Sequence, residues 1–363
     1  MENLEINLFG NVFKNKRVLV TGHTGFKGSW LALWLSELGA KVGGLSLDPC
    51  TTPNHWDLLG LSVDDHRGDI RDVEKTTDFV KNFSPEIVFH LAAQPLVRRS
   101  YRDPLETFST NIMGTANVLE ACRHVNSVQS IVCITTDKVY ANKEWTWGYR
   151  ENDILGGHDP YSASKAACEI VLDSYRKAFF EEENRCLLAT VRAGNVIGGG
   201  DWSEDRLIPD LVRATTTNSE LEIRSPNATR PWQHVLESLC GYLMVGQRLI
   251  ERKAEFAQAW NFGPNAEDNR RVIEILDELK LYWPKLAFGV TADPQPHEAN
   301  LLYLDNSMAK SKLNWQPVWT LQKCLLQTAQ WYQSQASDGN ISSREQLHQF
   351  IDDARRLDRA WAQ

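Results

Sequence analysis

One short glycine-rich segment limits the possible folds of this chain more than any other feature. Gly22-His-Thr-Gly25-Phe-Lys-Gly28 directly follows an apolar, β-branched run at 17–21 and precedes a helical pattern at 26–38. The first glycine permits a tight turn, the next lets a diphosphate approach the backbone, and the last lets the helix pack close to the sheet. The order of strand, glycine loop and helix predicts a dinucleotide site. The loop residues expected to contact the dinucleotide are Gly22, His23, Thr24, Gly25, Phe26, Lys27 and Gly28.

The first half of the chain repeats this alternation of strand and helix. Short β-branched runs alternate with longer segments of helical period, the pattern of a parallel sheet covered by helices. The predicted strands span residues 17–21, 41–47, 87–91, 130–135 and 186–191. The predicted helices span residues 26–38, 104–122 and 161–182. We therefore expect an α/β chain with a Rossmann-type, doubly wound parallel sheet.

A change of pattern after Ala193 indicates a second, smaller and discontinuous α/β lobe. From this point glycine-, proline- and arginine-containing loops dominate, with a further short strand at 260–262. Further helices are expected at 272–279, 321–332 and 343–361. The dinucleotide-binding domain is expected to comprise residues 1–193, about 231–260 and a helix at about 318–336. The substrate-binding domain is expected at about 194–230 and 261–317, followed by a helical tail at 337–363.

Charge and cysteine content argue against several classes of function. Lys and Arg number 39 and Asp and Glu number 47, so the net charge is −8, the wrong sign for a nucleic-acid partner. No apolar run approaches the roughly 20 residues that span a bilayer, and no membrane partner is expected. Seven cysteines without a C-x-x-C pair predict reduced thiols in the cytoplasm, with neither disulfides nor a metal site.

The acid at the end of the second predicted strand indicates which dinucleotide binds. Asp48 lies close to the roughly 20 residues beyond the first glycine at which an acid binds the adenosine ribose. An acid there favours NAD over NADP. The other interpretation of Asp48 is a turn residue before Pro49.

A tyrosine and a lysine share one face of a predicted helix. Asp159 and Pro160 provide a capping acid and a proline suited to the first helical position, so a helix begins near Tyr161. Lys165 follows four residues later, where its ammonium can favour the phenolate, as can a positive nicotinamide ring. A free tyrosine titrates near about pH 10, so this help is needed before Tyr161 can act as a base at neutral pH.

Further motifs give the chain a family resemblance. The segments His90-Leu-Ala-Ala-Gln94, Asn111-Ile-Met-Gly-Thr115, Thr135-Thr-Asp-Lys138 and Arg192-Ala-Gly-Asn-Val196 follow the order of the extended short-chain dehydrogenase/reductases. The chain resembles these proteins from about Arg17 to Trp319, which implies NAD as the cofactor. The resemblance implies that Thr136 hydrogen-bonds the sugar hydroxyl that Tyr161 deprotonates. Besides the glycine loop, the implied cofactor contacts are Asp48, Asp69, Ile70, Ala92, Ala93, Gln94, Asn111, Tyr161 and Lys165.

Within that superfamily the chain is similar to the sugar-nucleotide 4,6-dehydratases. Most relatives have Thr-Asp-Glu where this chain has Thr136-Asp137-Lys138. This lysine, with the string at 22–30 and Trp145-Thr-Trp-Gly-Tyr-Arg-Glu151, resembles the CDP-glucose 4,6-dehydratases in particular. The implied reaction converts CDP-D-glucose to CDP-4-dehydro-6-deoxy-D-glucose. It oxidises carbon 4, eliminates water across carbons 5 and 6, and returns the hydride to carbon 6.

The resemblance also implies the catalytic residues. Asp137 would protonate the leaving hydroxyl, and Lys138 would act at carbon 5. An exposed lysine is almost fully protonated at neutral pH, so Lys138 can be a base only in a desolvated site beside other cations. The alternative is that Lys138 stabilises the enolate electrostatically. The expected catalytic residues are Thr136, Asp137, Lys138, Tyr161 and Lys165.

The substrate contacts are expected to come from the second lobe. Arg206 and Arg230 are the basic residues expected against the diphosphate or ribose of the substrate, and Asn195 is expected to offer a hydrogen bond. Trp202 packs either on the base or sugar, or in the protein core. The substrate implied by the resemblance is CDP-glucose.

Two segments depart from the family pattern. His23 and Lys27 replace the small and apolar residues common in the glycine loop, so they either alter how tightly NAD is held or lie in solvent. Pro296-His-Glu-Ala299 lacks an arginine that dTDP-glucose relatives carry, which leaves the strictness for cytidine open.

Two other functions share much of this pattern. A sugar-nucleotide 4-epimerase would use Tyr161, Lys165 and Thr136 but does not need the Asp137–Lys138 pair. A non-catalytic NAD-sensing protein would keep the fold, although intact Tyr161 and Lys165 argue against it. Homodimers in the family often pair the helices that here would begin at Pro104 and Tyr161, so we expect a homodimer or homotetramer.

Overall fold

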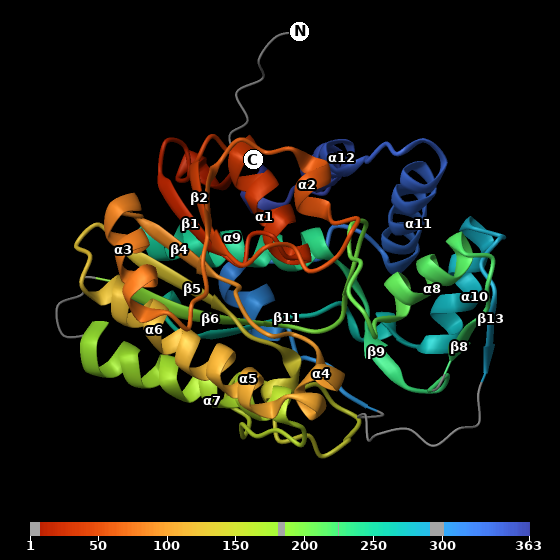
Figure 1. Cartoon of the computed structure of the whole chain (residues 1–363), viewed down its shortest axis with the longest axis horizontal. Coiled ribbons are helices and arrows are strands. Elements are labelled where there is room, and N and C mark those ends of the chain that lie inside the picture. Colours follow the sequence, from red (N-terminus) through yellow and green to blue (C-terminus); the bar gives the residue numbers. More distant parts are fainter. Residues whose placement is uncertain (1–7, 181–185, 224, 291–300) are drawn as a thin grey trace, which may run out of the picture.

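The central element is a seven-stranded parallel sheet in the order β3-β2-β1-β4-β5-β6-β11 (Figure 1). The computed structural model describes residues 8–180, 186–223, 225–290 and 301–363. Strand order reverses between β1 and β4, and ligands of such sheets bind in the crevice at this switch point. The doubly wound parallel sheet predicted from the sequence is confirmed. Its strands are β1 (Arg17–Thr21), β2 (Lys41–Ser46), β3 (Asp64–Arg67), β4 (Ile87–His90), β5 (Ser130–Ile134), β6 (Leu187–Ala193) and β11 (Ala259–Phe262).

Helices cover both faces of the sheet, each over its own apolar cluster (Figure 1). One face carries α1 (Phe26–Glu37), α9 (Val235–Ile250) and α12 (Ser343–Arg356), with α2 (His55–Leu59) beside α1. The other face carries α3 (Val73–Phe83), α6 (Gly114–Arg123) and α7 (Pro160–Tyr175), together with α4 (Val97–Arg102) and α5 (Pro104–Phe108). The helix predicted at 104–122 contains a wider π turn at Ser109–Met113 between α5 and α6. A second π turn, Arg176–Phe180, extends α7.

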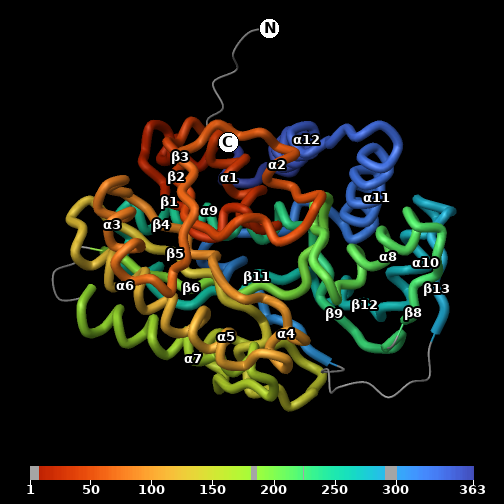
Figure 2. The backbone as a smooth tube through the Cα atoms, in the orientation of Figure 1, coloured from red at the N-terminus to blue at the C-terminus, as the bar shows by residue number. Residues whose placement is uncertain are grey.

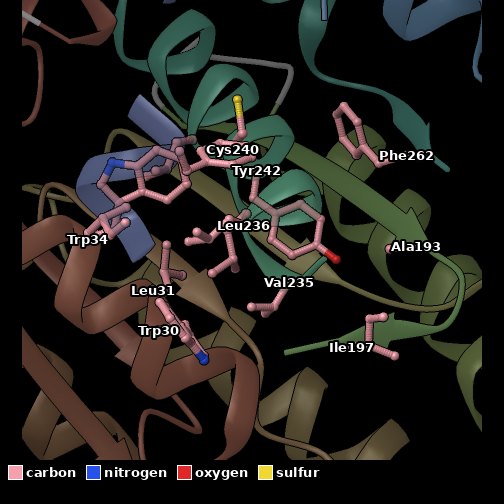
Figure 3. Close-up of a cluster of buried hydrophobic side chains, with 14 of the residues drawn as sticks. Trp30, Leu31, Trp34, Ala193, Ile197, Val235, Leu236, Cys240, Tyr242 and Phe262 are labelled. Carbon is pink, nitrogen blue, oxygen red and sulfur yellow. The ribbon is translucent and has the colours of Figure 1, made fainter. Parts of the chain in front are cut away.

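The contact between α1 and α9 forms the centre of the larger cluster (Figure 3). Trp30 and Trp34 of α1 are fully buried, and Leu236 and Tyr242 of α9 are buried with them. Since α9 also packs against β5 and β6, α1 is fixed relative to the sheet through this contact. The first turn of α1 is thereby held at the carboxyl end of β1.

The smaller lobe is built from two separate stretches of the chain (Figure 2). It contains α8 (Leu207–Thr216), α10 (Val272–Tyr282) and three strand pairs. The pairs are β7 (Val196–Ile197) with β10 (Gln233–His234), β8 (Leu221–Ile223) with β13 (Phe288–Val290), and antiparallel β9 (Thr229–Pro231) with β12 (Asn269–Arg271). The domain boundaries stay a prediction, and two elements bear on them. Strand β11 pairs with β6 across the boundary expected at 260, and α11 (Leu321–Asp338) packs on α10.

Strand β3 is absent from the predicted strands for a physical reason. Its sequence, Asp64-Asp-His-Arg67, has no apolar alternation, yet it pairs in parallel with β2. It lies at the edge of the sheet, where charged side chains are tolerated and protect against aggregation.

The remaining short 3-10 and π segments lie outside the sheet. They are Phe9–Asn11, Asp137–Val139, Ala254–Phe256, Ala266–Asp268, Ala309–Leu313 and Ala360–Ala362.

Candidate active site

One cavity of about 1130 Å³ extends along the carboxyl ends of the strands and under the smaller lobe. It brings together most of the residues that the sequence predicted for cofactor, substrate and catalysis. The predicted residues that line it are Gly22, Thr24, Gly25, Phe26, Lys27, Gly28, Asp48, Asp69, Ile70, Ala92, Ala93, Gln94, Thr136, Asp137, Lys138, Tyr161, Lys165, Asn195, Arg206 and Arg230. Three predicted residues, His23, Asn111 and Trp202, do not line it.

The glycine loop forms a cradle that side chains would fill. Gly22 has φ of +74°, and a Cβ there would lie 2.7 Å from the backbone nitrogen of Ala92. A Cβ on Gly28 would lie 2.1 Å from the carbonyl oxygen of Gly22, so the helix packs directly on the turn. Gly25 is the N-cap of α1, and no side chain caps that helix end. The unpaired N–H groups of the first turn therefore remain for an anionic ligand.

Asp48 and Asp69 both line the cavity but differ in their partners. The Asp48 side chain is 86% exposed, 3.6 Å from Nε of Arg67. Asp69 accepts two hydrogen bonds from the guanidinium of Arg71, at 2.9 and 2.6 Å. These bonds lower the pKa of Asp69 against the smaller effect of its burial. Asp48 is therefore free to accept from ribose hydroxyls, whereas Asp69 is held beside Ile70 by its own arginine.

Asn111 is placed behind the cavity wall and not in it. Its Oδ1 accepts from the backbone N–H of Gln94 at 2.8 Å, and its Nδ2 donates to the Ser164 hydroxyl at 2.8 Å. Ser164 in turn donates to the carbonyl oxygen of Tyr161 at 2.7 Å. Asn111 therefore does not line the cavity, because its polar atoms join the loop after β4 to the first turn of α7, and its direct contact with the cofactor stays a prediction.

Asp137 and Lys138 lie on a single 3-10 turn that follows β5. Thr136 caps this turn, and its hydroxyl donates to Oδ1 of Asp137 at 3.0 Å. Asp137 is only 2% exposed, and among the described residues its Oδ2 has no hydrogen-bond partner. Lys138 is partly exposed and lines the cavity. The turn thus presents a buried carboxyl and an amine side by side.

Tyr161 lies against this turn from the start of α7. Its hydroxyl hydrogen-bonds to Thr136, but burial has the larger effect and raises the pKa of Tyr161 to about 12. Burial also lowers the pKa of Lys165, whose Nζ donates to the carbonyl oxygen of Ile134 at 3.2 Å. The sequence predicted that Lys165 would favour the phenolate, yet in the protein alone burial keeps the phenol protonated at neutral pH.

The smaller lobe contributes the arginines. Arg206 forms an ion pair with Asp201 at 3.1 Å and lines the same cavity as Tyr161, and its charge partly opposes the rise in the pKa of Tyr161 that burial causes. Arg230 is 8% exposed on β9 and also lines the cavity. Arg98 of α4 also lines the cavity and pairs with Asp205 at 3.4 Å, although it is not among the residues predicted from the sequence. The signal in the sequence was the presence of three arginines, Arg98, Arg99 and Arg102, within six residues.

His23 and Trp202 point away from the cavity. His23 is fully buried, and its Nε2 lies 2.8 Å from Oδ1 of Asp65 on β3. Trp202 packs edge-on against Trp331 and Tyr332 of α11, which is the core role that its residue type equally allowed. Neither side chain lines the cavity, so the expected cofactor contact of His23 and substrate contact of Trp202 gain no support from the structure and stay predictions. The expectation that His23 could be solvent-exposed is also wrong.

Two negative observations apply to the part of the chain that the structure describes. No group of three or more His, Cys, Asp or Glu side chains is arranged to hold a metal ion there. No helix in these residues is both long and apolar enough to cross a bilayer. The Pro296–Ala299 segment lies outside the described residues.

Comparisons with known proteins agree with this geometry. A family model described as GDP-mannose 4,6 dehydratase matches residues 19–328. A CDP-glucose 4,6-dehydratase from Salmonella typhimurium is 47% identical over 350 residues, which cover 94% of this chain and 98% of the relative.

Solved structures share the fold. An epimerase from Methanothermobacter thermautotrophicus superimposes with a TM-score of 0.79 at 23% identity, over 92% of this chain and 96% of that one. A dTDP-glucose 4,6-dehydratase from Bacillus anthracis, solved in complex with NAD, gives a TM-score of 0.72 at 21% identity over 88% and 97%. Because the family model and the Salmonella relative both span most of the sequence, the chain belongs to the nucleotide-sugar 4,6-dehydratase family of the extended short-chain dehydrogenase/reductases.

Proposed function

We propose that this chain is a hydro-lyase that converts CDP-D-glucose to CDP-4-dehydro-6-deoxy-D-glucose with NAD. The observation that carries the proposal is the Asp137–Lys138 turn beside Tyr161 and Lys165 in one cavity. An enzyme that only oxidised or epimerised carbon 4 would need the tyrosine but not a buried acid next to an amine. The 47% identical CDP-glucose 4,6-dehydratase supports the same reaction.

The cavity fits NAD at the carboxyl ends of β1 and β2. The uncapped first turn of α1 would bind the diphosphate, and the backbone at Gly22 and Gly25 leaves room for it. Asp48 would accept from the adenosine ribose, while Ala92 and Ala93 would line the dinucleotide. When bound, NAD supplies the hydride chemistry, by removing hydride from carbon 4 and returning it to carbon 6.

In the oxidation step Tyr161 would take the proton of the carbon 4 hydroxyl. The Thr136 hydroxyl, which hydrogen-bonds to Tyr161 in the structure, would also hydrogen-bond the carbon 4 hydroxyl of the sugar. Since burial raises the pKa of Tyr161 to about 12, the residue acts as a base only with positive charge in the cavity, and Arg206 supplies part of it. Lys165 adds a second cation one helical turn away.

In the elimination step Asp137 would protonate the carbon 6 hydroxyl as it leaves. Its burial and its Oδ2 without a partner among the described residues suit a group that meets the substrate and not water. Lys138 would act at carbon 5, where two roles remain compatible with its position. It either removes the proton as a base or stabilises the enolate by its charge.

The smaller lobe would hold the CDP moiety. Arg206 and Arg230 line the cavity from two different segments, so both can face one diphosphate or ribose. Asn195 lines the cavity beside them and offers a hydrogen bond. Trp232 would pack on the base or sugar, because it lines the cavity and its Nε1 donates to the carbonyl oxygen of Arg270 at 3.2 Å.

The test of the function is product mass with a panel of nucleotide sugars. The chain would be incubated with NAD and CDP-, dTDP-, UDP- or GDP-glucose. We expect loss of one water from CDP-glucose at the highest rate. Unchanged mass with a changed sugar would identify a 4-epimerase, and no turnover of any sugar would favour a binding protein. Deuterium at carbon 4 should reach the methyl group of the product.

We also propose that the chain forms a homodimer, or a homotetramer built from it. The face of α5 and α7 exposes large apolar side chains, Leu105 at 78% and Ile170 at 63%, with Met113 and Phe179 near them in the sequence. Exposed apolar patches of this kind mark association surfaces. Sedimentation velocity of the chain and of Ile170→Asp would test this, since the variant should shift the mass toward the monomer.

A reducing compartment such as the cytoplasm fits the cysteines. All seven lie in described residues as free thiols, and six of them are buried. Cytosolic reductants keep thiols in this state. We propose a cytoplasmic enzyme of deoxysugar biosynthesis, which fractionation of the host cells would check.

A further inference from the structure

His55 lies behind the wall of the cavity, at a point where three separate parts of the chain meet. It is the first residue of α2 and is 2% exposed. Its Nδ1 lies 2.8 Å from the hydroxyl oxygen of Ser29, in the first turn of α1. Its Nε2 lies 2.8 Å from the hydroxyl oxygen of Ser343, the first residue of α12. None of the three residues lines the cavity, so the ring can act on the site only through its neighbours.

The direction of each hydrogen bond around the ring follows from its two ends. The hydroxyl of Ser29 has one proton, which it donates to the carbonyl oxygen of Phe26 at 2.9 Å. Nδ1 of His55 must therefore donate to Ser29, and in a neutral ring Nε2 then accepts. Ser343 donates to Nε2, and its oxygen accepts from Nε1 of Trp331 at 2.8 Å. The opposite direction would leave the Ser343 proton without an acceptor among the described residues, so the ring is held as its Nδ1–H tautomer.

The segment that begins the smaller lobe, residues 198–201, packs directly on the same group. A Cβ on Gly200 would lie 2.6 Å from Cγ of His55. A Cβ on Gly199 would lie 1.9 Å from Cγ of Trp331. The two glycines therefore allow the backbone of this segment to lie against both rings, and a displaced ring would displace the segment.

Both sides of the ring lead to the candidate site through one short stretch of chain each. On one side Ser29 directly follows Gly28, the last residue of the glycine loop that lines the cavity. On the other side Asp201 ends segment 198–201, and its carboxylate pairs with Arg206 at 3.1 Å. The same buried ring thus supports the cofactor end of the cavity and an arginine of the substrate end.

The support for the ring comes from the C-terminal part of the chain. Ser343 lies 288 residues beyond His55 in the sequence, and α2 and α12 both lie beside α1 (Figure 1). Helix α12 is fixed on α1 by the edge-on contact of Phe350 with Trp34, at 5.8 Å between ring centres, and by the ion pair of Arg344 with Glu37. The position of Ser343 is therefore set by α1 packing on α12.

We propose that His55 is a positioning residue, through which α12 holds the first turn of α1 and segment 198–201 in the geometry that binds NAD and the nucleotide sugar. The proposal rests on the proposed function only for the identity of the sugar nucleotide. The Ser29 side of the ring serves NAD, and the Gly200 side serves the sugar nucleotide. Misplacing a binding group by about 1 Å through a remote change can lower a rate about 100-fold.

Two substitutions separate the two sides of the ring. His55→Asn keeps an amide N–H near the position of Nδ1, so it can donate to Ser29 but no longer reaches Ser343. NAD should bind within about threefold of the parent, and KM for CDP-glucose should rise about tenfold. His55→Gln places its amide oxygen near the position of Nε2, so it can accept from Ser343 but loses the bond to Ser29. NAD should bind about tenfold more weakly, and KM should change by less than about threefold.

The two quantities are measured independently. Fluorescence titration with NAD needs no turnover, and KM is measured at saturating NAD. His124→Asn is the matched control and should change neither quantity, because this half-exposed ring lies at the end of α6, on the other face of the sheet. Circular dichroism of each variant confirms that it is folded.

The parent protein allows a further measurement that depends on no variant. Nuclear magnetic resonance of the ring nitrogens distinguishes a protonated nitrogen from an unprotonated one, and the His55 signals are assigned through bonds to its own backbone. At neutral pH we expect a protonated Nδ1 and an unprotonated Nε2.

Three results would overturn the proposal. These are a protonated Nε2 in the parent, equal effects of the two His55 variants on NAD affinity and on KM, as a merely structural role would produce, and no effect of either variant. The product-mass assay of the parent is run separately. Failure of that assay would remove the proposed function, whereas the NAD titrations and the ring tautomer would still decide whether His55 positions the cofactor loop.

Discussion

Glu169 and Arg192 form a fully buried ion pair one helical turn beyond Lys165, with Oε1 of Glu169 2.9 Å from Nε of Arg192 and Oε2 3.0 Å from Nη2. The hydroxyls of Thr135 and Thr190 donate to the same carboxylate at 2.5 and 2.8 Å. Burial opposes ionisation of Glu169, but the arginine and these donors keep its pKa below the usual value. The pair joins α7, which carries Tyr161 and Lys165, to the ends of β5 and β6.

Replacing one residue of this ion pair should lower the stability of the folded protein. Glu169→Gln leaves the Arg192 charge buried without a counter-ion, and we expect a loss of about 3–5 kcal/mol in the free energy of unfolding by urea. The pKa of Lys165 should also fall further, because Glu169 is one of the groups that raise it. The double variant Glu169→Met/Arg192→Met is the control and should regain much of the stability. A single variant as stable as the parent would contradict the assignment.

Two substitutions should separate the oxidation step of the reaction from the loss of water. Tyr161→Phe should abolish oxidation, so no near-ultraviolet absorbance of reduced nicotinamide appears in a single turnover. Lys138→Ala should allow that absorbance to rise but stall the loss of water, by about 100-fold or more. Stopped-flow absorbance and product mass measure the two steps. Normal dehydration by Lys138→Ala would show that Lys138 has neither role proposed for it.

Two glycines of the loop allow a test of whether the space beside each one is left for a ligand or is filled by protein atoms. A Cβ on Gly25 would lie 3.4 Å from the nearest protein atom, an ordinary contact, whereas one on Gly28 would lie 2.1 Å from Gly22. Gly25→Ala should therefore stay within about 1 kcal/mol of the parent in stability but bind NAD at least about tenfold more weakly. Gly28→Ala should lose about 3 kcal/mol of stability. Fluorescence titration with NAD and urea unfolding measure the two effects.

The control for these alanines is a glycine far from the cavity. Gly339 ends α11 with φ of +75°, and a Cβ added there would meet no atom within 4 Å. Gly339→Ala should cost about 1 kcal/mol of stability through backbone strain and leave NAD affinity unchanged. Equal NAD affinity in Gly25→Ala and Gly339→Ala would contradict the assignment of the glycine loop.

As the pH falls, this protein should begin to lose stability at a higher pH than protonation of its carboxylates alone would cause. Burial lowers the pKa of His55, His90 and His234 to about 3, while unfolded histidine titrates near 6.5. Their contribution to stability is complete above pH 6.5 and is lost as the pH falls toward 3, because the unfolded chain binds more protons. Glu237, whose pKa burial raises to about 8, acts in the opposite direction between about pH 8 and 4.5.

Between about pH 6.5 and 4.5 these four groups together give a difference of two protons between the unfolded and the folded chain, or about 2.7 kcal/mol per pH unit. Burial also lowers the pKa of His23, which adds to the slope in the same direction as the other histidines. Urea unfolding at several pH values measures this slope. His234→Leu should reduce it by about one proton, since this ring is fully buried and its Nε2 has no partner among the described residues. Exposed His348→Gln is the control and should leave the slope unchanged. A flat stability profile across this range would contradict the burial of the three rings.

The cofactor half of the site could be predicted because its signals are local. A tight turn, close approach to a backbone and close helix packing each require glycine, so the positions of Gly22, Gly25 and Gly28 follow from sequence order alone. Tyr161 and Lys165 are also local, because a helix fixes residues four apart on one face. Strand β3 could not be predicted, since its charged sequence becomes a strand only by pairing with β2.

The three predicted site residues that do not line the cavity share a different cause. Asn111, His23 and Trp202 have polar or aromatic groups that suit a ligand as well as a protein partner. In each case another segment supplies that partner: Gln94 and Ser164 for Asn111, Asp65 for His23, and α11 for Trp202. Residue type shows that a partner is required, and only the packing of distant segments shows which one.

The sequence by itself determined most of the sheet, the glycine loop, and the order of Asp137, Lys138 and Tyr161 along the chain, because these depend on backbone geometry over a few residues. The tertiary structure decided the charge environment. Lys27 is bound to Tyr242 and faces Arg206 and Asp137 only because α9 and the smaller lobe close over α1. The energy of a charge depends on its desolvation and on neighbours distant in the chain, and neither quantity is written in local sequence.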